Sequence, residues 1–231
     1  MSPARRGASA AETEALALAE RVLELVRARA ATAEAEVNVR TGTYALTRFA
    51  NGAIHQNVAE ELREVGVRIA LDGRVAAARL DGPAGEDELR AMVDGAFQAA
   101  AVTPVDDDWP GLASPTASPA VDHWDDATGA SMPDERARMV AAFVGAAEGL
   151  VTAGAVSTSA VHAAFANTAG QAITGRTTSA DIDGIARTAS SDGVARQSSV
   201  RVAAIDAAAA GRRAAQKARD GAEPGDLVPG R

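Results

Sequence analysis

The chain has 231 residues, no cysteine, three histidines and a formal net charge of −8. The absence of cysteine excludes a disulfide framework, a thiol nucleophile, an iron–sulfur cluster and a cysteine zinc site. The acidic balance argues against broad binding to nucleic acid or to an anionic membrane, because both need a basic surface.

Alanine dominates the composition with 58 residues, whereas Val, Ile, Leu and Phe together contribute 43. Such a small share of large apolar residues borders on the composition of disordered chains, so periodicity must decide whether a core forms. Residues 1–12 are small and polar and are predicted to be a disordered N-terminus. No apolar run approaches 18 residues, so we expect no membrane span and a cytoplasmic location.

Residues 13–104 are predicted to form an N-terminal α+β domain. A helix over 13–31 places Leu18, Val22 and Leu25 on one face, and a helix over 85–102 carries a second apolar stripe. Between residues 36 and 80 the period of the apolar residues changes to two, which is typical of strands. Turn signals at 41–42, 51–52 and 72–73 divide this stretch into four antiparallel strands that pack on the helices.

Residues 133–231 are predicted to form a second, middle α+β domain after an acidic, proline-containing linker at 105–132. Helices are expected over 133–151 and 203–219, with strands between them and hairpin turns at 183–184 and 192–193. Trp109 and Trp124 in the linker are interpreted as anchors that attach it to a domain. The predicted fold class is therefore α+β, with two domains that each contain an antiparallel sheet and flanking helices.

A short sequence echo connects the two halves. Phe49-Ala50-Asn51 recurs as Phe165-Ala166-Asn167. Chance produces three such matches readily in a chain this rich in alanine, so the echo alone does not establish a repeat.

The residue chemistry offers no catalytic centre. His55, His123 and His162 are isolated, and none has a second histidine at the spacing of a helical zinc motif. No G-x-S-x-G sequence frames Ser157 or Ser159, and no glycine-rich phosphate loop is present. No catalytic or metal-ligating residue is assigned, and these patterns favour a binding or scaffolding unit.

One stretch resembles the N-terminal domain of the TldD/PmbA family. Its features are Arg48 before the Asn51-Gly52 turn, the Gly66-Val67-x-Ile69 strand that contains Arg68, and the Asp72-Gly73 turn. The resemblance covers most of residues 36–220. It departs at 75–76, where Val-Ala replaces a glycine-containing step often seen in the family.

The resemblance implies a cytoplasmic metallopeptidase system that acts on peptides and unfolded segments. In that family a catalytic subunit pairs with a similar non-catalytic one, and its zinc motif HExxxH follows the region that corresponds to this chain's end. This chain has no such motif. The resemblance therefore implies no cofactor here, with zinc in a missing C-terminal domain or in the partner subunit. We expect a natural truncation or an excised part of a longer protein, closer to the PmbA-like, non-catalytic half.

The leading functional prediction is the N-terminal part of a metallopeptidase-related protein in proteolysis, inactive alone, that supplies scaffold, dimer contacts and substrate-channel surface. Candidate substrate contacts are Arg48, Asn51, Gly52 and Arg68, because a sheet can add an extended peptide by β-augmentation. Turn geometry alone also explains Asn51-Gly52, and a solvated sheet face explains the two arginines.

The expected partners are a homologous TldD/PmbA-type subunit, as a homo- or heterodimer, and a peptide substrate. Neither nucleic acid nor a membrane is expected as a partner. The alternative is a freestanding, non-catalytic regulatory protein that binds a full-length paralogue or a peptide. Direct modulation of DNA does not fit a charge of −8.

Overall fold

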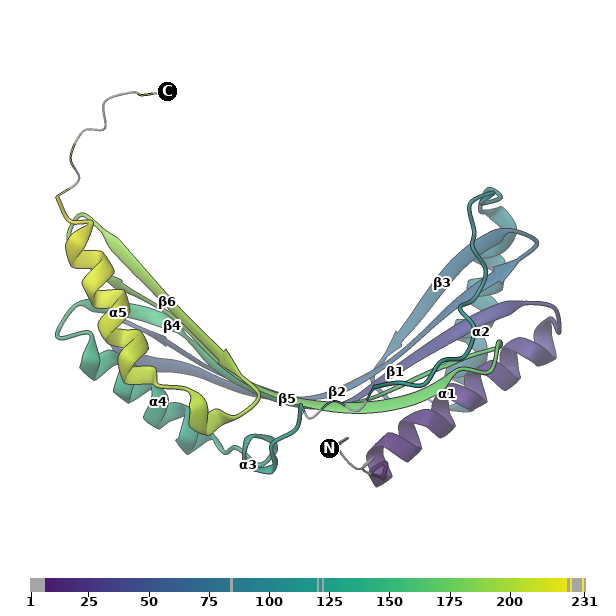
Figure 1. The fold of residues 1–231 in the computed structure, drawn as a ribbon, viewed down its shortest axis with the longest axis horizontal. Coiled ribbons are helices and arrows are strands. Elements are labelled where there is room, and N and C mark those ends of the chain that lie inside the picture. Colours follow the sequence, from purple (N-terminus) through teal and green to yellow (C-terminus); the bar gives the residue numbers. More distant parts are fainter. Residues whose placement is uncertain are drawn as a thin grey trace. The chain divides into compact units, whose positions relative to one another are not determined.

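The computed structural model describes residues 7–83, 85–119, 121, 123–223, 225 and 230. Residues 1–6 of the predicted disordered N-terminus lie outside the described residues. The fold is α+β, as predicted (Figure 1). Its elements in chain order are α1 (Ala10–Arg29), β1 (Glu34–Ala50), β2 (Ala53–Leu71), β3 (Arg74–Asp81), α2 (Glu86–Val102), α3 (Asp126–Gly129), α4 (Pro133–Ala146), β4 (Val151–Asn167), β5 (Ala172–Arg187), β6 (Asp192–Ser199), the 3-10 turn η1 (Val202–Ala204) and α5 (Ala207–Asp220).

The strands form an antiparallel sheet in the order β3-β2-β1-β4-β5-β6. Along the chain, a helix, three strands and a helix occur twice, as α1-β1-β2-β3-α2 and as α4-β4-β5-β6-α5. In each repeat, neighbouring strands of the chain are neighbours in the sheet. The fold is therefore built from two copies of one αβββα arrangement.

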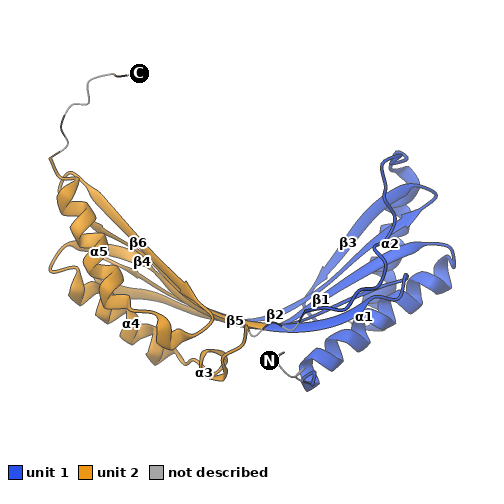
Figure 2. Ribbon diagram, in the orientation of Figure 1, with its two compact units in different colours: residues 1–42, 61–122, 161–176 blue, residues 43–60, 123–160, 177–231 orange. Residues whose placement is uncertain are grey.

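The chain forms two compact units, and each unit combines three separate segments (Figure 2). Unit 1 contains residues 1–42, 61–122 and 161–176, and unit 2 contains 43–60, 123–160 and 177–231. The tip of the β1–β2 hairpin thus belongs to unit 2, and the tip of the β4–β5 hairpin belongs to unit 1. The predicted succession of domains at 13–104 and 133–231 stays a prediction, because compactness here does not follow chain order.

In unit 1, α1 and α2 cover one face of the strands (Figure 1). The buried side chains alternate along each strand, as Val65, Val67 and Ile69 do on β2. Helix α1 begins at Ala10, before the predicted Thr13, because a capping box fixes its start. In this box Ser9 and Glu12 bond each other's backbone N–H groups.

In unit 2, α4 and α5 cover one face of the strands, and here backbone approaches backbone closely. A Cβ at Gly211 of α5 would overlap the carbonyl oxygen of Phe143 in α4, and a Cβ at Gly184 of β5 would overlap the Phe143 ring. Phe49 of β1 packs on that same ring, with centroids 5.5 Å apart. The buried face of α5 contains only small residues: Ala207, Ala210, Gly211, Ala214, Ala215 and Ala218.

Two of the predicted hairpin turns are confirmed. Asn51-Gly52 joins β1 to β2 with φ of 52° and 74°, and Asp72-Gly73 joins β2 to β3 with φ of 50° and 73°. Two successive residues with positive φ are what a type I′ turn requires. The predicted turn at 41–42 is wrong, because both residues lie inside β1, so residues 34–81 form three long strands and not four.

The two turns predicted in the second repeat are also wrong. Residues 183–184 lie inside β5, and residues 192–193 begin β6 after a turn at 188–191. Gly184 is required for the close contact with Phe143, which is a different use of glycine from a turn. The sequence echo does not mark equivalent positions either. Phe49 is buried in the core of unit 2, whereas Phe165 is half-buried between Ala164 and Ala166, which face the core of unit 1.

A pair of helical glycines tests the close packing in unit 2. Gly145 of α4 has nothing near its added Cβ, so Gly145→Ala is expected to raise the free energy of unfolding by up to about 1 kcal/mol through helix propensity. Gly211→Ala is expected to lower it by about 1–3 kcal/mol, because the new methyl group displaces α4. Urea unfolding measures both changes. Equal stability of the two variants would contradict the close approach of α5 to α4.

Candidate functional site

The four predicted substrate-contact residues fall into two groups. Arg48, Asn51 and Gly52 lie in residues 43–60, the hairpin tip that belongs to unit 2. Arg68 lies on β2 in unit 1. The structure therefore brings three of them together on one hairpin and leaves the fourth in the other compact unit.

Arg48 points away from the helices of unit 2. It alternates with the buried Thr47 and Phe49, so its side chain emerges on the opposite face, which we call the helix-free face. Its guanidinium donates to Gln56 Oε1 at 3.1 Å and makes no ion pair with any described residue. Arg48 is thus an exposed cation available to a ligand.

The turn residues Asn51 and Gly52 are exposed and serve the hairpin geometry. The Gly52 N–H donates to the carbonyl oxygen of Thr152 at 3.4 Å, next to the start of β4. Two large apolar side chains on the same hairpin tip are open to solvent: Tyr44 at 41% and Ile54 at 43% exposure. Sequence reasoning missed both, because a strand pattern assigns apolar residues to the core.

A row of hydrogen-bonding side chains continues the helix-free face onto β4 and β5. The Ser159 and Ser179 hydroxyls are 3.0 Å apart, and the Ser179 hydroxyl donates to Asp181 Oδ2 at 3.0 Å. These residues alternate with buried Thr158 and Ala180, which places them opposite α4 and α5. We call them the Ser159–Asp181 row. This part of the helix-free face of unit 2 is consequently rich in hydrogen-bond donors and acceptors.

Behind the hairpin tip lies a buried arginine that sequence reasoning did not single out. Arg136 of α4 is 1% exposed, and its guanidinium donates to Thr47 Oγ1 at 3.2 Å and to Thr158 Oγ1 at 3.1 Å, with a longer contact of 3.5 Å to Asn57 Oδ1. No described carboxylate accepts a hydrogen bond from it. Burial lowers the pKa of Arg136 from its ordinary value. Arg136 thereby ties the hairpin tip to α4 and positions the strand that carries Arg48.

In unit 1, Arg68 is engaged by its own chain. Its guanidinium pairs with Glu36 at 2.7 Å and stacks over the Trp109 ring, 5.1 Å from the centroid. The Trp109 indole N–H donates to Glu34 Oε2 at 2.5 Å. These contacts confirm that Trp109 anchors the predicted linker. Trp124 donates to Asp126 Oδ1 at 2.7 Å, beside the short helix α3.

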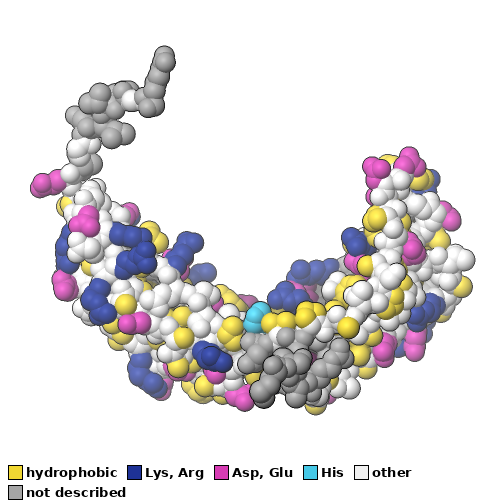
Figure 3. Space-filling model, in the orientation of Figure 1, with side chains coloured by type: hydrophobic (Ala, Val, Ile, Leu, Met, Phe, Trp, Pro, Cys, Tyr) yellow, Lys and Arg dark blue, Asp and Glu magenta, His cyan; other side chains and the backbone are white. Residues whose placement is uncertain are grey.

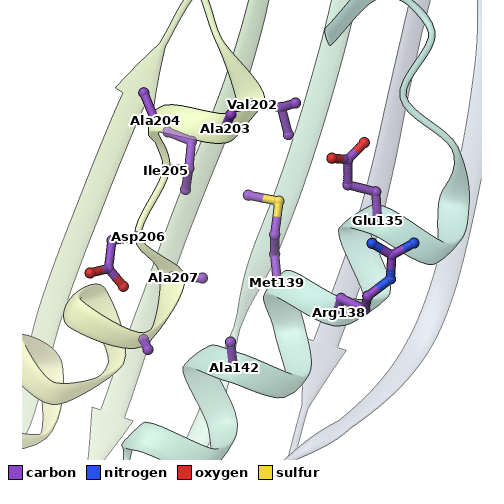
Figure 4. Close-up of a pocket in the computed structure, with 11 residues that line it drawn as sticks. Glu135, Arg138, Met139, Ala142, Val202, Ala203, Ala204, Ile205, Asp206 and Ala207 are labelled. Atoms are coloured by element: carbon purple, nitrogen blue, oxygen red, sulfur yellow. The ribbon is translucent and has the colours of Figure 1, made fainter. Parts of the chain in front are cut away.

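A shallow groove of about 500 Å³ lies in unit 2 between α4 and residues 202–208 (Figure 4). Met139 points into it towards Val202 and Ile205, whereas Glu135, Arg138 and Asp206 stand at its rim. Arg138 is exposed and makes no ion pair with a described residue. No motif marks this groove, since five of its eleven lining residues are alanine and its side chains come from two distant segments.

Neither a metal-ligating cluster nor a membrane-spanning helix occurs among the described residues. No three His, Asp or Glu side chains gather there in a way that could hold a metal ion. No described helix combines the length and apolarity that crossing a bilayer requires. Figure 3 shows acidic and basic side chains interspersed over the visible surface of each unit.

Comparison with known proteins places this fold in a recognised group. Residues 35–100, which include most of β1, all of β2 and β3 and nearly all of α2, match the model of PmbA/TldA metallopeptidase domain 1. No curated protein sequence matches the chain.

Three solved structures share the fold at 15% sequence identity. TldE from Thermococcus kodakarensis has a TM-score of 0.72 and is covered over 47% of its length by 90% of this chain. A candidate modulator of a DNA gyrase from Thermotoga maritima scores 0.67, with 87% of this chain on 47% of that one. A candidate modulator of DNA gyrase from Bacteroides thetaiotaomicron scores 0.75, with 88% on 49%. The chain therefore spans about half the length of these structures.

The family model and the shared fold together support the assignment to the TldD/PmbA family that the resemblance of residues 47–74 predicts. Residues 35–100 correspond to the first domain of that family.

Arg136 provides a test of how the hairpin tip is held. Arg136→Met keeps the length of the side chain and removes a buried charge that lacks a carboxylate, so its free energy of unfolding should stay within about 1 kcal/mol of the parent. Arg136→Ala leaves a cavity and is expected to cost about 3 kcal/mol. Thermal and urea unfolding measure both variants. If Arg136→Met lowered the free energy of unfolding as much as Arg136→Ala does, the guanidinium hydrogen bonds would outweigh the cost of burying the charge.

Proposed function

We propose that this chain is the non-catalytic, polypeptide-binding part of a TldD/PmbA-type, metallopeptidase-related assembly in the cytoplasm, active in peptide and protein processing. In this proposal it supplies scaffold, contacts to a homologous subunit and a surface on which an extended substrate lies. The zinc of such an assembly would belong to a C-terminal domain or to the partner subunit. The match to the TldD/PmbA family supports the kind of assembly that we propose, and the surface of the sheet supports the binding role.

One observation carries the binding role: the helices of each unit cover a single face of its strands. In unit 2 the opposite face presents Arg48, Gln56 and the Ser159–Asp181 row. An extended polypeptide has backbone N–H and C=O groups that need partners once water is removed. Hydroxyl, amide and carboxylate groups on this face can supply those partners with little dependence on the sequence of the bound polypeptide.

The hairpin tip adds preferences for ligand chemistry. Tyr44 and Ile54 provide apolar contact area, and Arg48 provides a cation without an acidic partner among the described residues. The surface therefore favours extended segments that combine apolar and acidic side chains. Asn51 and Gly52 would contribute by shaping the turn beside these groups. Arg68 would contact a substrate only after releasing Trp109.

Peptide binding tests this proposal. The probe is a fluorescein-labelled, unstructured 12-residue peptide with leucine and glutamate residues but no aromatic residue, measured by fluorescence anisotropy. The intact chain should bind it, and Arg48→Ala should weaken the binding about three- to tenfold, as loss of one charged contact would. Arg90→Ala is the matched control, since Arg90 is an exposed arginine on α2 paired with Glu86 at 2.7 Å.

Two results would overturn the proposal. Equal affinities for Arg48→Ala and Arg90→Ala would remove the hairpin tip from the binding surface. Stoichiometric, tightly held zinc, found by metal analysis of the purified chain, would contradict its non-catalytic role.

A further inference from the structure

Residues 103–119 lie across the helix-free face of unit 1. Near one end, the backbone N–H of Asp106 donates to the carbonyl oxygen of Gly73, in the β2–β3 turn, at 2.7 Å. Near the other end, Thr116 meets Gln171, which directly precedes β5. Since the sheet order is β3-β2-β1-β4-β5, the segment traverses β2, β1 and β4 between these points. We call it the 103–119 segment.

The centre of the segment is held by a single aromatic anchor. Trp109 lies under the Arg68 guanidinium and donates its indole N–H to Glu34. The other oxygen of the same carboxylate, Glu34 Oε1, accepts the backbone N–H of Leu112 at 3.5 Å. Glu36 holds Arg68 in place at 2.7 Å. Two acidic residues and one arginine of the strands thus form a receptor for one indole ring.

The other hydrogen bonds between the segment and the strands go to the main chain of the segment and not to its side chains. The side-chain amide of Gln171 accepts the Thr116 N–H at 2.6 Å and donates to the Thr116 carbonyl at 3.0 Å, as a neighbouring strand would. The backbone N–H groups of Asp106 and Leu112 donate to the strands, and the Arg74 guanidinium donates to the Thr103 carbonyl oxygen. Prolines at 104, 110 and 115 restrict the backbone on both sides of a turn at 106–109, in which the Trp109 N–H donates to the Asp106 carbonyl oxygen at 3.3 Å. This restriction reduces the entropy lost on docking.

We propose that this face of unit 1 is a binding site for an extended polypeptide that carries an aromatic residue, and that the 103–119 segment occupies it intramolecularly as a gate. The inference rests on the proposed function for its biological use, because it adds a second, regulated polypeptide surface to the one on unit 2. Its structural basis is independent of Arg48 and of the hairpin tip.

Competition makes the gate effective although the contact is shallow. Trp109 keeps part of its surface in solvent, so the docked state is open to displacement. A short tether holds a segment at an effective concentration on the order of millimolar. A free polypeptide of micromolar concentration therefore enters the site only when it binds much more tightly than the segment does, or when the Trp109 anchor is lost.

The test uses a labelled peptide with the sequence of residues 103–119 and the full chain as receptor. Trp109→Ala should bind this peptide at least about tenfold more tightly than the parent chain, because the competing anchor is gone. The same peptide with alanine in place of tryptophan should bind Trp109→Ala about tenfold more weakly. Trp124→Ala, which alters the tryptophan beside α3, is the matched control and should behave as the parent.

Equal binding by the parent and Trp109→Ala would overturn the gate, and so would equal binding of the two peptides. A second measurement on the parent chain covers a folding defect in the variant. Excess free peptide should displace the segment and speed thermolysin cleavage within 103–119, and an unchanged cleavage rate would also overturn the proposal.

The two proposals fail separately. Suppose that binding of the aromatic-free peptide depends on Arg48 but Trp109→Ala binds the 103–119 peptide no more tightly than the parent. That result would contradict the gate alone. Suppose instead that Trp109→Ala binds the 103–119 peptide more tightly, but Arg48→Ala leaves the affinity for the aromatic-free peptide unchanged. That result would contradict the unit 2 binding surface alone.

Discussion

The close packing of α5 on α4, and of both helices on the strands of unit 2, is the constraint on which the rest of the structure depends. Phe143 is enclosed by Gly184, Gly211 and Phe49, and the buried face of α5 is built from alanine and glycine. Small residues let the elements approach until backbone atoms touch, so dispersion contacts replace the bulk of large side chains. A chain with 58 alanines can therefore form a core despite its shortage of large aliphatic residues.

In unit 2 this packing places α4 and α5 on one face of the strands, and in unit 1 α1 and α2 likewise cover one face. The chemistry of the molecule lies on the opposite, helix-free face. In unit 2 it carries an arginine without an acidic partner among the described residues and a row of hydroxyls, while in unit 1 it carries the receptor for Trp109. The buried Arg136 connects α4 to the strands of unit 2, because it donates to threonine hydroxyls on the strands that carry Arg48 and Ser159. The same strands thus serve the core with one set of alternating residues and a ligand with the other.

Local chemistry explains which parts of the fold the sequence could predict. Asn51-Gly52 and Asp72-Gly73 were predictable, since both residues of each pair adopt positive φ in the turn. The dipeptide at 183–184 has the same composition as a hairpin turn, yet its glycine makes room for Phe143, which lies on a helix 41 residues earlier in the chain. The capping box at Ser9 and Glu12 is a local sequence signal that places the start of α1 at Ala10, ahead of the predicted start at Thr13. The exchange of hairpin tips between the units leaves no local signal, because it depends on the lengths of strands that have no breaks.

The candidate site shows the same division. Arg48 could be selected from the sequence through the resemblance of residues 47–74 to the TldD/PmbA family, and its exposure follows from its charge within a strand. Tyr44 and Ile54 could not, since an apolar residue in a strand is normally buried. Trp109 was predictable as an anchor, but its partners Glu34 and Arg68 come from strands distant in sequence. Sequence alone therefore suggested where function could reside but not which side chains meet.

Hydrogen–deuterium exchange of the intact chain, with and without the aromatic-free acidic peptide at saturation, tests the central claim most directly. The account predicts added protection in residues 43–60 and in the adjoining parts of β4 and β5, with α4, α5 and residues 202–208 unchanged. Protection confined to α4 and residues 202–208, or to none of these segments, would contradict the claim that the helix-free face of unit 2 binds extended polypeptide.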